Sequence, residues 1–376
     1  MRPNLKGRPT FCLIDLEAIR WNFRQARKKI GAGIQIFSVV KANAYGHGAR
    51  EVAATLEEEG SEGFGIATVE EGLELRNGGI HSPLLILGGI FPEQLDALLD
   101  NNLTPVVSEM ESLCRLEQMV QSRKTSLDFH LKVDTGMGRI GFLASEMASW
   151  LPELTKLKGL KLIGVMSHFT QMENAAQDYT QKQLDLFRNV LQRIQSEGYH
   201  PPFVHTTKSA GVLTFPPSHF TMVRPGLMLY GIYPSLETVK EATLKPALSW
   251  KTKIIQLKKV PKGSSISYEQ TFVTRRESLI ATLPVGYADG YKRLLSNRGA
   301  VLVRGQRAPI AGLVTMDLTM VDVTGIGGVQ QGDEVVLLGK QGEDTISAGE
   351  MAQWADSISY EILTSISTRV PRIYAG

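Results

Sequence analysis

One short segment combines a lysine at the end of an apolar run with a histidine between two glycines. It reads VKANAYGHG over residues 40–48, and it contains Lys41 and His47. Burial disfavours a charged ammonium and lowers the pKa of a lysine, which is the condition that Schiff-base chemistry requires. Lys41 is therefore a candidate for a covalent bond to a carbonyl group. The alternatives are a lysine that simply reaches solvent at the end of a strand and a histidine that is only a loop residue.

Polar and ionisable residues also gather where later apolar runs end. In chain order they are Lys132, Asp134, Arg139, Ser167, His168, His205, Lys208, Ser209, Arg224 and Gly226. If these runs are the parallel strands of a barrel, their carboxyl ends meet on one face, and functional groups lie there. The pattern therefore predicts one active site. For His168, a hydrogen-bonded structural histidine is the alternative.

The loop after Lys132 holds GMGRIG over residues 136–141, which matches the pattern of a dinucleotide-binding loop. Such a loop should follow the first strand, and an acid should end the next strand. Here the loop follows the fifth apolar run, and the next run ends in Ser167 and His168. Arg139 inside the motif is also better suited to meet an anionic substrate than to allow close backbone packing. We interpret the match as a coincidence and predict no NAD site.

Small residues follow the last two apolar runs. Ser209, Ala210 and Gly211 come after the seventh run, and Gly226 and Leu227 lie in the eighth. Small residues let backbone N–H groups approach an anion, and eight-stranded barrels often bind phosphate in these two loops. We predict a phosphate site there, with an ordinary helix cap at Ser209 as the alternative.

The segment between residues 35 and 230 must position these groups, and in it short apolar runs alternate with amphipathic stretches. Apolar residues recur at helical spacing in Val69–Arg76 and Tyr179–Ser196. Apolar strands separated by helices are typical of a parallel sheet covered on both faces. Eight runs favour a (β/α)8 barrel over the alternative, an open doubly wound sheet. The runs are Gln35–Val40, Gly63–Ala67, Leu84–Leu87, Thr104–Val107, Leu127–Val133, Leu162–Met166, Phe203–Thr206 and Met222–Leu229.

A different pattern begins near residue 240. Strand-like runs are separated there by glycine-containing turns, which favours an antiparallel β domain. A helix is expected over Ser347–Asp356, with Ser347 as its N-cap and Glu350 at the third helical position. We therefore expect an α/β chain with a TIM-like (β/α)8 barrel over 11–237 and a mostly antiparallel β domain over 238–376, with which residues 1–10 could pack. The predicted strands are Lys253–Lys259, Leu279–Leu283, Ala300–Val303, Met320–Val323 and Glu334–Leu338.

Composition narrows the class of protein. With 376 residues the chain exceeds one typical core, and its net charge of +3 favours neither a nucleic-acid nor a membrane-surface role. Cys12 and Cys114 are too few for a disulfide framework and too far apart for a metal knuckle. We find neither a secretory signal nor a run of eighteen apolar residues. We expect a cytoplasmic protein that binds no metal, membrane or nucleic acid.

The ordered set of motifs closely resembles the alanine racemases, barrel-type enzymes that depend on pyridoxal 5'-phosphate. The resemblance spans Phe11 to Arg372. It is carried by VKANAYGHG (40–48), KVDTGMGRIG (132–141), VRPG (223–226), SY (267–268), LPVGYADGY (283–291), MD (316–317) and RVPR (369–372). It implies an isomerase that interconverts L-alanine and D-alanine and supplies D-alanine for cell-wall peptidoglycan. The substrate it implies is a small-molecule amino acid.

The resemblance also implies roles for single residues. Lys41 corresponds to the lysine that holds the cofactor as an internal aldimine, and Tyr268 of a second subunit to the base on the opposite face. Tyr268 would act on L-alanine and Lys41 on D-alanine. His168 and Arg224 correspond to residues behind the tyrosine, and Arg224 also to the arginine that faces the pyridine nitrogen. An arginine gives that nitrogen a hydrogen bond but hardly ever a proton, which implies a weaker electron sink.

Other positions correspond to residues that bind the substrate or the cofactor. Arg139 and Met316 match contacts with the substrate carboxylate, and Asp317, beside Met316, belongs to the predicted catalytic set. Lys132 matches a lysine that is often carbamylated and orients the arginine. The phosphate-binding positions are matched by Tyr45, Ser209, Gly226, Leu227 and Tyr360. Since Tyr268 and Met316 act across an interface, the resemblance implies a homodimer with shared active sites.

Four positions depart from the family pattern, without removing a catalytic group. Lys208 stands where an asparagine is frequent, Glu269 where a glycine is common, Leu313 where an arginine often lines the entrance, and Leu318 where glutamine is typical. These departures bear on substrate entry, rate and preference for alanine.

Three other functions remain to be tested against the racemase. One is a broader amino-acid racemase that acts on serine or lysine. Another is a barrel-type pyridoxal-phosphate decarboxylase, against which the LPVGYADGY and MD motifs speak. The last is a cofactor-binding protein without activity, a class that lacks the C-terminal β domain.

Overall fold

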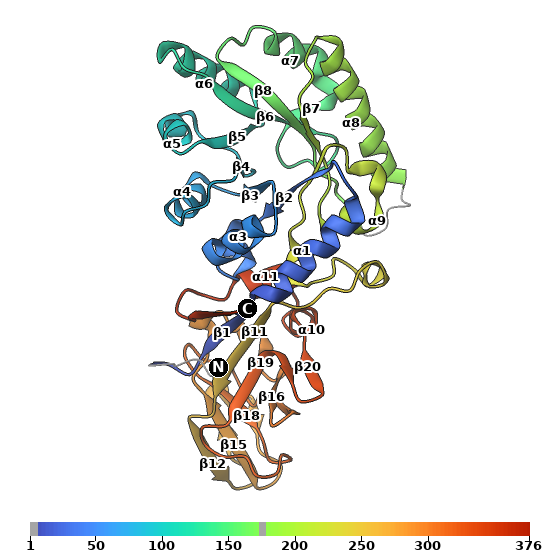
Figure 1. Cartoon of the computed structure of the whole chain (residues 1–376). Coiled ribbons are helices and arrows are strands. Elements are labelled where there is room, and N and C mark those ends of the chain that lie inside the picture. The colour runs from blue at the N-terminus through green and yellow to red at the C-terminus, as the bar shows by residue number, and fades with distance from the viewer. Residues whose placement is uncertain (1–6, 173–177) are drawn as a thin grey trace. The chain divides into compact units, whose positions relative to one another are not determined.

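A computed structural model of the chain describes residues 7–172 and 178–376, and the described chain divides into two compact units (Figure 1). The β unit contains the described residues up to Ala18, together with Tyr45–Gly48 and Pro246–Gly376. The barrel unit contains Ile19–Ala44 and Ala49–Lys245. The chain therefore leaves the barrel unit for the four residues Tyr45–Gly48, shortly after Lys41.

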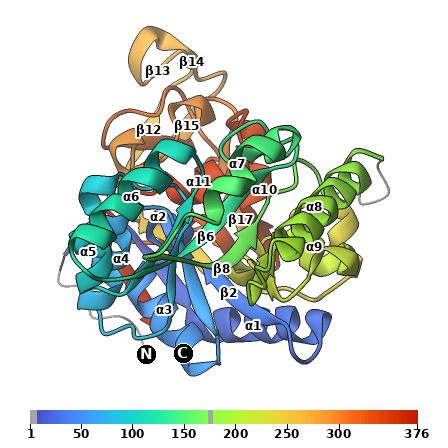
Figure 2. The same cartoon turned by 90° about the horizontal axis from the view of Figure 1, so that it is seen from above.

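Eight parallel strands form the sheet of the barrel unit, in the order β10-β2-β3-β4-β5-β6-β8-β9. Hydrogen bonds between Thr221 and Val204 join the two ends of this order, so that the ring is nearly closed. Figure 2 shows helices α3 to α8 outside the strands. The predicted (β/α)8 barrel is confirmed. The strands are β2 (Gln35–Val39), β3 (Gly63–Ile66), β4 (Leu84–Ile86), β5 (Leu103–Val107), β6 (Leu127–Asp134), β8 (Leu160–Met166), β9 (Phe203–His205) and β10 (Met222–Val223), with β7 (Phe142–Leu143) beside β6.

Amphipathic helices cover the outside of the barrel strands. In α8, for example, Leu184, Phe187 and Ile194 lie on the buried face at helical spacing. A buried cluster of side chains from five strands fills part of the barrel, and its members are Phe37, Leu85, Val106, Met166 and Met222. The helices are α1 (Leu16–Ile30), α3 (Ala49–Glu58), α4 (Val69–Asn77), α5 (Leu95–Asp100), α6 (Met110–Ser122), α7 (Met147–Leu154), α8 (Asp178–Ser196) and α9 (Ser209–Thr214).

The eighth strand is much shorter than the predicted Met222–Leu229. Strand β10 ends at Val223, and the chain continues through Pro225 into a 3-10 helix over Leu227–Tyr230. Proline lacks the N–H group that a central strand would donate, so the sheet ends before it. The apolar pattern of the sequence continues beyond the strand because all four residues of the 3-10 helix are buried, and this made the predicted strand too long.

Antiparallel pairing dominates the β unit, as predicted. Its largest sheet has the order β17-β16-β19-β11-β1-β21, in which only β1 and β21 are parallel neighbours. Strands β12, β15 and β18 form a second sheet, and β13 and β14 a hairpin. The strands are β1 (Phe11–Asp15), β11 (Leu248–Lys253), β12 (Gln256–Val260), β13 (Ser265–Ile266), β14 (Phe272–Val273), β15 (Ser278–Leu283), β16 (Ala300–Val303), β17 (Gln306–Pro309), β18 (Thr319–Asp322), β19 (Glu334–Gln341), β20 (Asp344–Ile346) and β21 (Arg372–Ala375).

Three details of the β unit differ in how well the sequence pattern predicted them. The predicted strand Lys253–Lys259 is wrong, because the chain leaves one sheet at Lys253 and joins another at Gln256. Helix α10 (Ala348–Trp354) begins as predicted, since the Ser347 hydroxyl accepts a hydrogen bond from the Glu350 amide. A second helix, α11 (Ser359–Thr364), was not predicted.

In the part of the chain that the structure describes, no helix is both long enough and apolar enough to cross a membrane.

Candidate active site

Lys41 begins a short turn, α2 (Lys41–Tyr45), with an unusual backbone. Ala42, Asn43, Ala44 and Tyr45 all have φ between 52° and 54°, which is the left-handed region. For a residue with a side chain this conformation costs about 1–2 kcal/mol, so it persists only where other contacts impose it. The turn follows directly on strand β2 and places Lys41 at the carboxyl end of the barrel.

Hydrogen bonds on both sides hold the lysine turn. The Ala44 amide donates to the Val40 carbonyl at 2.7 Å, and the Ala42 amide donates to the Glu71 carboxylate at 2.7 Å. The Asn43 side chain accepts from the Ala49 amide at 2.8 Å. Burial, and next the charge of Arg139, lower the pKa of Lys41. A larger neutral fraction makes this amine a better nucleophile.

A buried chain of three side chains crosses the barrel interior behind this face. The Arg224 Nε donates to His205 Nδ1 at 2.8 Å, and His205 Nε2 lies 2.8 Å from His130 Nδ1. Arg224 also donates from Nη2 to the Ser167 carbonyl at 2.9 Å. All three side chains are at least 96% buried, so the guanidinium is held in one orientation.

Which atoms donate and which accept in this series of hydrogen bonds follows from Arg224. Arginine can only donate, so His205 Nδ1 must accept, and the proton of a neutral His205 lies on Nε2. That proton points to His130 Nδ1, which must then accept. Burial, and then the charge of Arg224, keep both histidines neutral: the pKa of His130 falls to about 3 and that of His205 falls well below its usual range. Both rings are therefore neutral at physiological pH.

Lys132 and His168 are further ionisable groups at the same end of the barrel. Burial, then Arg224 and Arg139, lower the pKa of Lys132 well below its usual value. Burial, then Arg224 and Lys132, lower the pKa of the half-buried His168. Positive groups that repel one another in a partly desolvated place favour an anion as their ligand.

The glycine loop after β6 is occupied by a side chain of its own. The Asp134 carboxylate accepts hydrogen bonds from the amides of Gly136, Met137 and Gly138, at 2.8–3.2 Å. These amides would cradle the pyrophosphate in a dinucleotide-binding loop. They serve an internal carboxylate here, in agreement with our interpretation of the motif as a coincidence. Arg139 lies exposed at the end of this loop.

Ser209 brings two helix starts together. Its Oγ accepts from the amides of Gly226 at 2.9 Å and Met228 at 3.2 Å, and Ser209 is itself the first residue of α9. The N-cap of α9 is Lys208, so the alternative of a cap at Ser209 is wrong. Ser209 Oγ occupies the amides of Gly226 and Met228, so a phosphate would use the hydroxyl proton of Ser209 and the other first N–H groups of the two helices, such as that of Leu227. The residues around Ser209, Gly226 and Leu227 therefore fit a phosphorylated cofactor.

Tyr268 lies in the β unit, next to the hairpin of β13 and β14 that Figure 2 shows at the edge of that unit. Its side chain is 70% exposed. Its neighbours Ser267, Glu269 and Gln270 have φ of 65°, 60° and 52°, so the tyrosine lies in a strained segment. The Ser267 hydroxyl holds this segment by donating to the Leu313 carbonyl at 2.7 Å.

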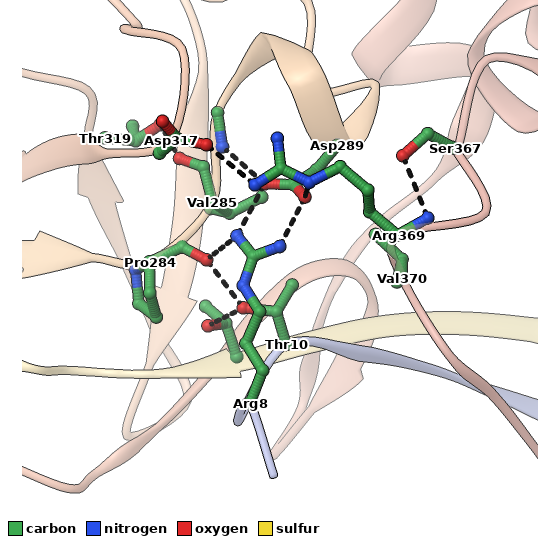
Figure 3. Close-up of polar contacts among 12 residues, drawn as sticks. Arg8, Thr10, Pro284, Val285, Asp289, Asp317, Thr319, Ser367, Arg369 and Val370 are labelled. Carbon is green, nitrogen blue, oxygen red and sulfur yellow. Dashed lines mark hydrogen bonds and ion pairs between the residues drawn. The ribbon is translucent and has the colours of Figure 1, made fainter.

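Asp289 is the buried hub of a charged network in the β unit (Figure 3). Arg8 donates to both of its carboxylate oxygens, at 2.5 and 2.6 Å, and the Gly286 amide donates to one of them at 3.1 Å. Arg369 lies 3.6 Å from Asp289 and reaches on to Asp317 at 2.7 Å. The network thus runs from the N-terminal segment to the loop that holds the predicted active-site residue Asp317.

The loop of Met316 and Asp317 is also fixed through its backbone. The amides of Tyr287 and Ala288 donate to the carbonyls of Thr315 and Met316, both at 3.0 Å. A Cβ atom at Gly286 would come within 2.4 Å of this backbone, so only glycine fits there. The Met316 side chain remains 54% exposed. The LPVGYADGY motif therefore forms the support of the Met316 loop.

Tyr45 and Tyr360 lie side by side in the β unit, with ring centroids 5.8 Å apart. The same unit holds Gly46 and Gly48, where an added Cβ would meet the Leu363 carbonyl at 2.3 Å and the Tyr374 hydroxyl at 1.9 Å. The Arg372 guanidinium donates to the Gly46 carbonyl at 3.0 Å. The lysine motif and the final RVPR motif thus meet in one place.

Three contributors to this geometry were not identified as site residues from the sequence: His130, Glu71 and Asp289. His130 lies two residues before Lys132 in β6, so alternation along a strand directs both to the same face of the sheet. Asp289 was visible as an acid inside the LPVGYADGY motif. Among the described residues, no group of three or more His, Cys, Asp or Glu side chains could hold a metal ion.

Two family models match nearly the whole chain. The alanine racemase N-terminal domain matches residues 14–234, and the alanine racemase C-terminal domain matches residues 247–374. The chain belongs to the alanine racemase family. The alanine racemase of Halothermothrix orenii is 46% identical over 98% of this chain and 97% of its own length. That of Carboxydothermus hydrogenoformans is 47% identical over 98% of this chain and all of its own.

Solved alanine racemase structures have the same fold. The enzyme of Bacillus anthracis, with bound L-Ala-P, superposes with a TM-score of 0.93 at 38% identity and covers 98% of this chain and 96% of its own. The enzyme of Bartonella henselae, with covalently bound pyridoxal phosphate, has a TM-score of 0.90 at 29% identity, over 98% and 100% of the two chains. Likeness over both units supports an alanine racemase fold throughout the chain.

The departures from the family pattern have ordinary surroundings. Lys208 is the N-cap of α9 without a side-chain cap bond, and Glu269 lies 3.7 Å from Arg293 in an exposed pair. Leu313 contributes its carbonyl to Ser267, which any residue could do, and Leu318 is 38% exposed.

Proposed function

We propose that this member of the alanine racemase family interconverts L-alanine and D-alanine with pyridoxal 5'-phosphate bound at Lys41. The observation that supports it best is Lys41 itself: an amine with a lowered pKa, at the carboxyl end of a barrel and on a left-handed turn. Relatives at 46% and 47% identity carry the name alanine racemase over their full length. The bound cofactor would draw electrons from the α-carbon of the amino acid and so make its proton removable.

Each side chain then has a defined task at a defined atom. Lys41 holds the cofactor and moves the α-proton of D-alanine, and Tyr268 moves that of L-alanine. Arg224, oriented by His205, presents its guanidinium to the pyridine nitrogen. His168 stands behind the tyrosine. Because arginine hardly ever gives up its proton, the pyridine nitrogen would stay unprotonated. The cofactor would then be a weaker electron sink, which limits side reactions.

The substrate carboxylate is proposed to bind Arg139 and the backbone of Met316. The ion pair of Asp317 with Arg369 would hold the Met316 loop in place. Lys132, a buried amine of lowered pKa, is suited to carbamylation, and a carbamate would orient Arg139. The cofactor phosphate is assigned to the helix starts joined by Ser209, and further to Gly226, Leu227, Tyr45 and Tyr360.

We infer that two copies of the chain share their active sites. Tyr268 and Met316 are exposed in the single chain, which supports this inference. A base that transfers protons in a site from which water is excluded must be covered, and a second copy of the chain would cover it. A homodimer in the cytoplasm that supplies D-alanine for peptidoglycan is the biological role we propose. The division into domains at 237/238 likewise stays a prediction.

The test is chiral analysis of single L-amino acids incubated with the cofactor-loaded protein, with Lys41→Ala as the blank. We expect D-alanine to rise toward an equal mixture and other amino acids to change little. Racemisation of serine or lysine at the same rate would replace the proposal by a broader racemase. Carbon dioxide release without racemisation would replace it by a decarboxylase, and undiminished racemisation by Lys41→Ala would refute the assignment of the lysine.

A further inference from the structure

One carboxylate, that of Glu71, joins the carboxyl ends of two neighbouring barrel strands. Strands β2 and β3 are neighbours in the barrel unit (Figure 1). They run parallel, and Val39 lies opposite Gly65 at the end of their pairing. Glu71 Oε1 accepts from the Ala42 amide, just after β2, at 2.7 Å. Glu71 Oε2 accepts from the Ala67 amide, just after β3, also at 2.7 Å. The side chain thus bridges the two places at which the chain leaves the sheet.

Glu71 is well placed for this bridge because of its position in helix α4. The Thr68 side chain caps the helix by accepting from the Glu71 amide, so Glu71 is the third helical residue. In the usual capping box, the acid at this position would bind back to the amide of the cap residue. Here it reaches one residue further back, to Ala67, and across to Ala42. Both of its oxygens are therefore bound to amides outside the helix.

The residue that Glu71 holds is the first left-handed residue after Lys41. Ala42 has φ 52° and ψ 50°, and the next three residues continue in the same region. None of the four is a glycine, so the conformation must be imposed by contacts. The Glu71 bond acts at the first peptide of the turn, where the direction of the Lys41 side chain is decided.

Three charged groups influence Lys41. Arg139, after β6, and Arg224, after β10, disfavour its charged form, whereas Glu71 favours it. Burial is the largest influence and acts with the two arginines. The negative charge of Glu71 opposes the effect of the two arginines. Its carboxylate is hydrogen-bonded to the amide of Ala42, the residue that follows Lys41.

We propose that Glu71 is a positioning residue for Lys41, which fixes the left-handed turn after the lysine and balances the charges of Arg139 and Arg224. The inference deepens the function proposed above and rests on it. Glu71 touches neither the substrate nor the cofactor in this scheme. It acts through the peptide between Lys41 and Ala42 and through its charge.

The experiment follows the attachment of pyridoxal phosphate to the full chain freed of its cofactor. Attachment is trapped with borohydride and located by peptide mass spectrometry, and its rate is measured against pH. The neutral amine is the species that reacts, so the rate rises with pH to a plateau whose midpoint follows the pKa of Lys41. The plateau reports how well the lysine is positioned, and the midpoint reports the charges around it.

Glu71→Gln is expected to change both quantities. Its amide nitrogen cannot accept from a backbone N–H, so one bridge is lost, and the plateau should fall on the order of tenfold, as for a charge-assisted hydrogen bond. With the negative charge gone, the ammonium is less stable and the midpoint should move to lower pH. Glu71→Asp keeps the charge on a shorter arm, so the plateau should fall while the midpoint moves less.

Glu74→Gln is the matched control, because Glu74 is an exposed acid on the same helix. It should leave plateau and midpoint as in the parent chain. The inference is overturned if Glu71→Gln and Glu71→Asp both behave like this control. It is also overturned if they lower thermal stability while plateau and midpoint stay unchanged, since Glu71 would then be only structural. If the parent chain itself attaches no pyridoxal phosphate at Lys41, the proposed function fails first, and the two failures are distinguishable.

Discussion

The barrel unit and the β unit hold their charged side chains by opposite means. In the barrel unit, Lys41, Lys132 and His168 have lowered pKa values, because burial and neighbouring cations disfavour their charged forms. In the β unit, Asp289 is fully buried, yet Arg8 binds both of its oxygens and Arg369 adds a second positive group. The three barrel groups are shifted toward their neutral forms, whereas the β unit pairs Asp289 with arginines.

The difference shows where chemistry and where support are located. Where an amine or imidazole is neutral, its nitrogen lone pair can form a bond or accept a proton. A paired and desolvated charge is fixed, since losing its partner would leave the other charge buried alone. We therefore propose that the barrel unit tunes Lys41 by burial and charge, and that the β unit holds Tyr268 and Met316 in a rigid frame. Four experiments test this contrast.

The largest effect is expected for Tyr268→Phe. Without the hydroxyl, interconversion of the enantiomers should fall by about 10²–10⁴ in both directions, because the equilibrium between them is unchanged. Lys41 would remain, so D-alanine should still exchange its α-proton in heavy water while L-alanine should not. Proton NMR of each enantiomer measures this. Equal exchange from both would break the assignment of one base to each unit.

Asp289→Ala should cost the β unit stability. It removes the shared partner of Arg8 and Arg369, and because both arginines are partly exposed the loss should be about 2 kcal/mol of the free energy of unfolding, less than for a fully buried pair. Urea unfolding monitored by tryptophan fluorescence gives the value. Glu343→Ala, which removes an exposed acid of the same unit, is the control. If the two variants lose the same stability, the network of Arg8, Asp289 and Arg369 is not the frame we describe.

The neutral histidines of the barrel should make its stability depend on pH. The pKa of His130 is about 3 in the folded chain and near 6.5 when unfolded, so the unfolded state binds more protons between these values. Stability should therefore be lost as pH falls below about 6.5, by about 1.4 kcal/mol per pH unit for this one group. His130→Gln keeps an acceptor for His205 without titrating, and its stability should fall less steeply.

The control for this measurement is His200→Gln, at an exposed position of the same unit. It should follow the parent chain through the whole pH range. A slope in His130→Gln as steep as in the parent would mean that His130 is already charged in the folded chain, and the contrast between the units would lose its clearest example.

The smallest effect is expected at Glu269. Its φ of 60° suits glycine, so Glu269→Gly should stabilise the β unit by less than about 1 kcal/mol, the relief of strain being partly offset by the greater freedom of the unfolded chain. Glu277→Gly serves as the control, since Glu277 is also exposed but has no positive φ, and it should destabilise slightly. Differential scanning calorimetry compares the two. Equal shifts would mean that the segment around Tyr268 is not strained.

Much of the fold was accessible from patterns, and the errors have physical causes. The apolar strands and amphipathic helices of the barrel unit repeat a period that reports burial directly. The break at Ile254 and Ile255 was missed because two isoleucines continue the apolar pattern while the chain changes sheets. The end of β10 was missed because a buried 3-10 helix has the same composition as a strand.

The sequence by itself determined most of the elements and which residue types can react, because local preference and hydrophobic period depend on neighbours in the chain. Lys41 and Arg224 were found from the apolar runs, whereas Tyr268 was identified only by the resemblance to the alanine racemases. Only the tertiary structure decided which atoms they meet. Glu71 reaches Ala42 across 29 positions of the sequence, His130 reaches His205 across 75, and Arg8 reaches Asp289 across 281. Such contacts depend on where folded elements come to lie, and no local pattern encodes that position.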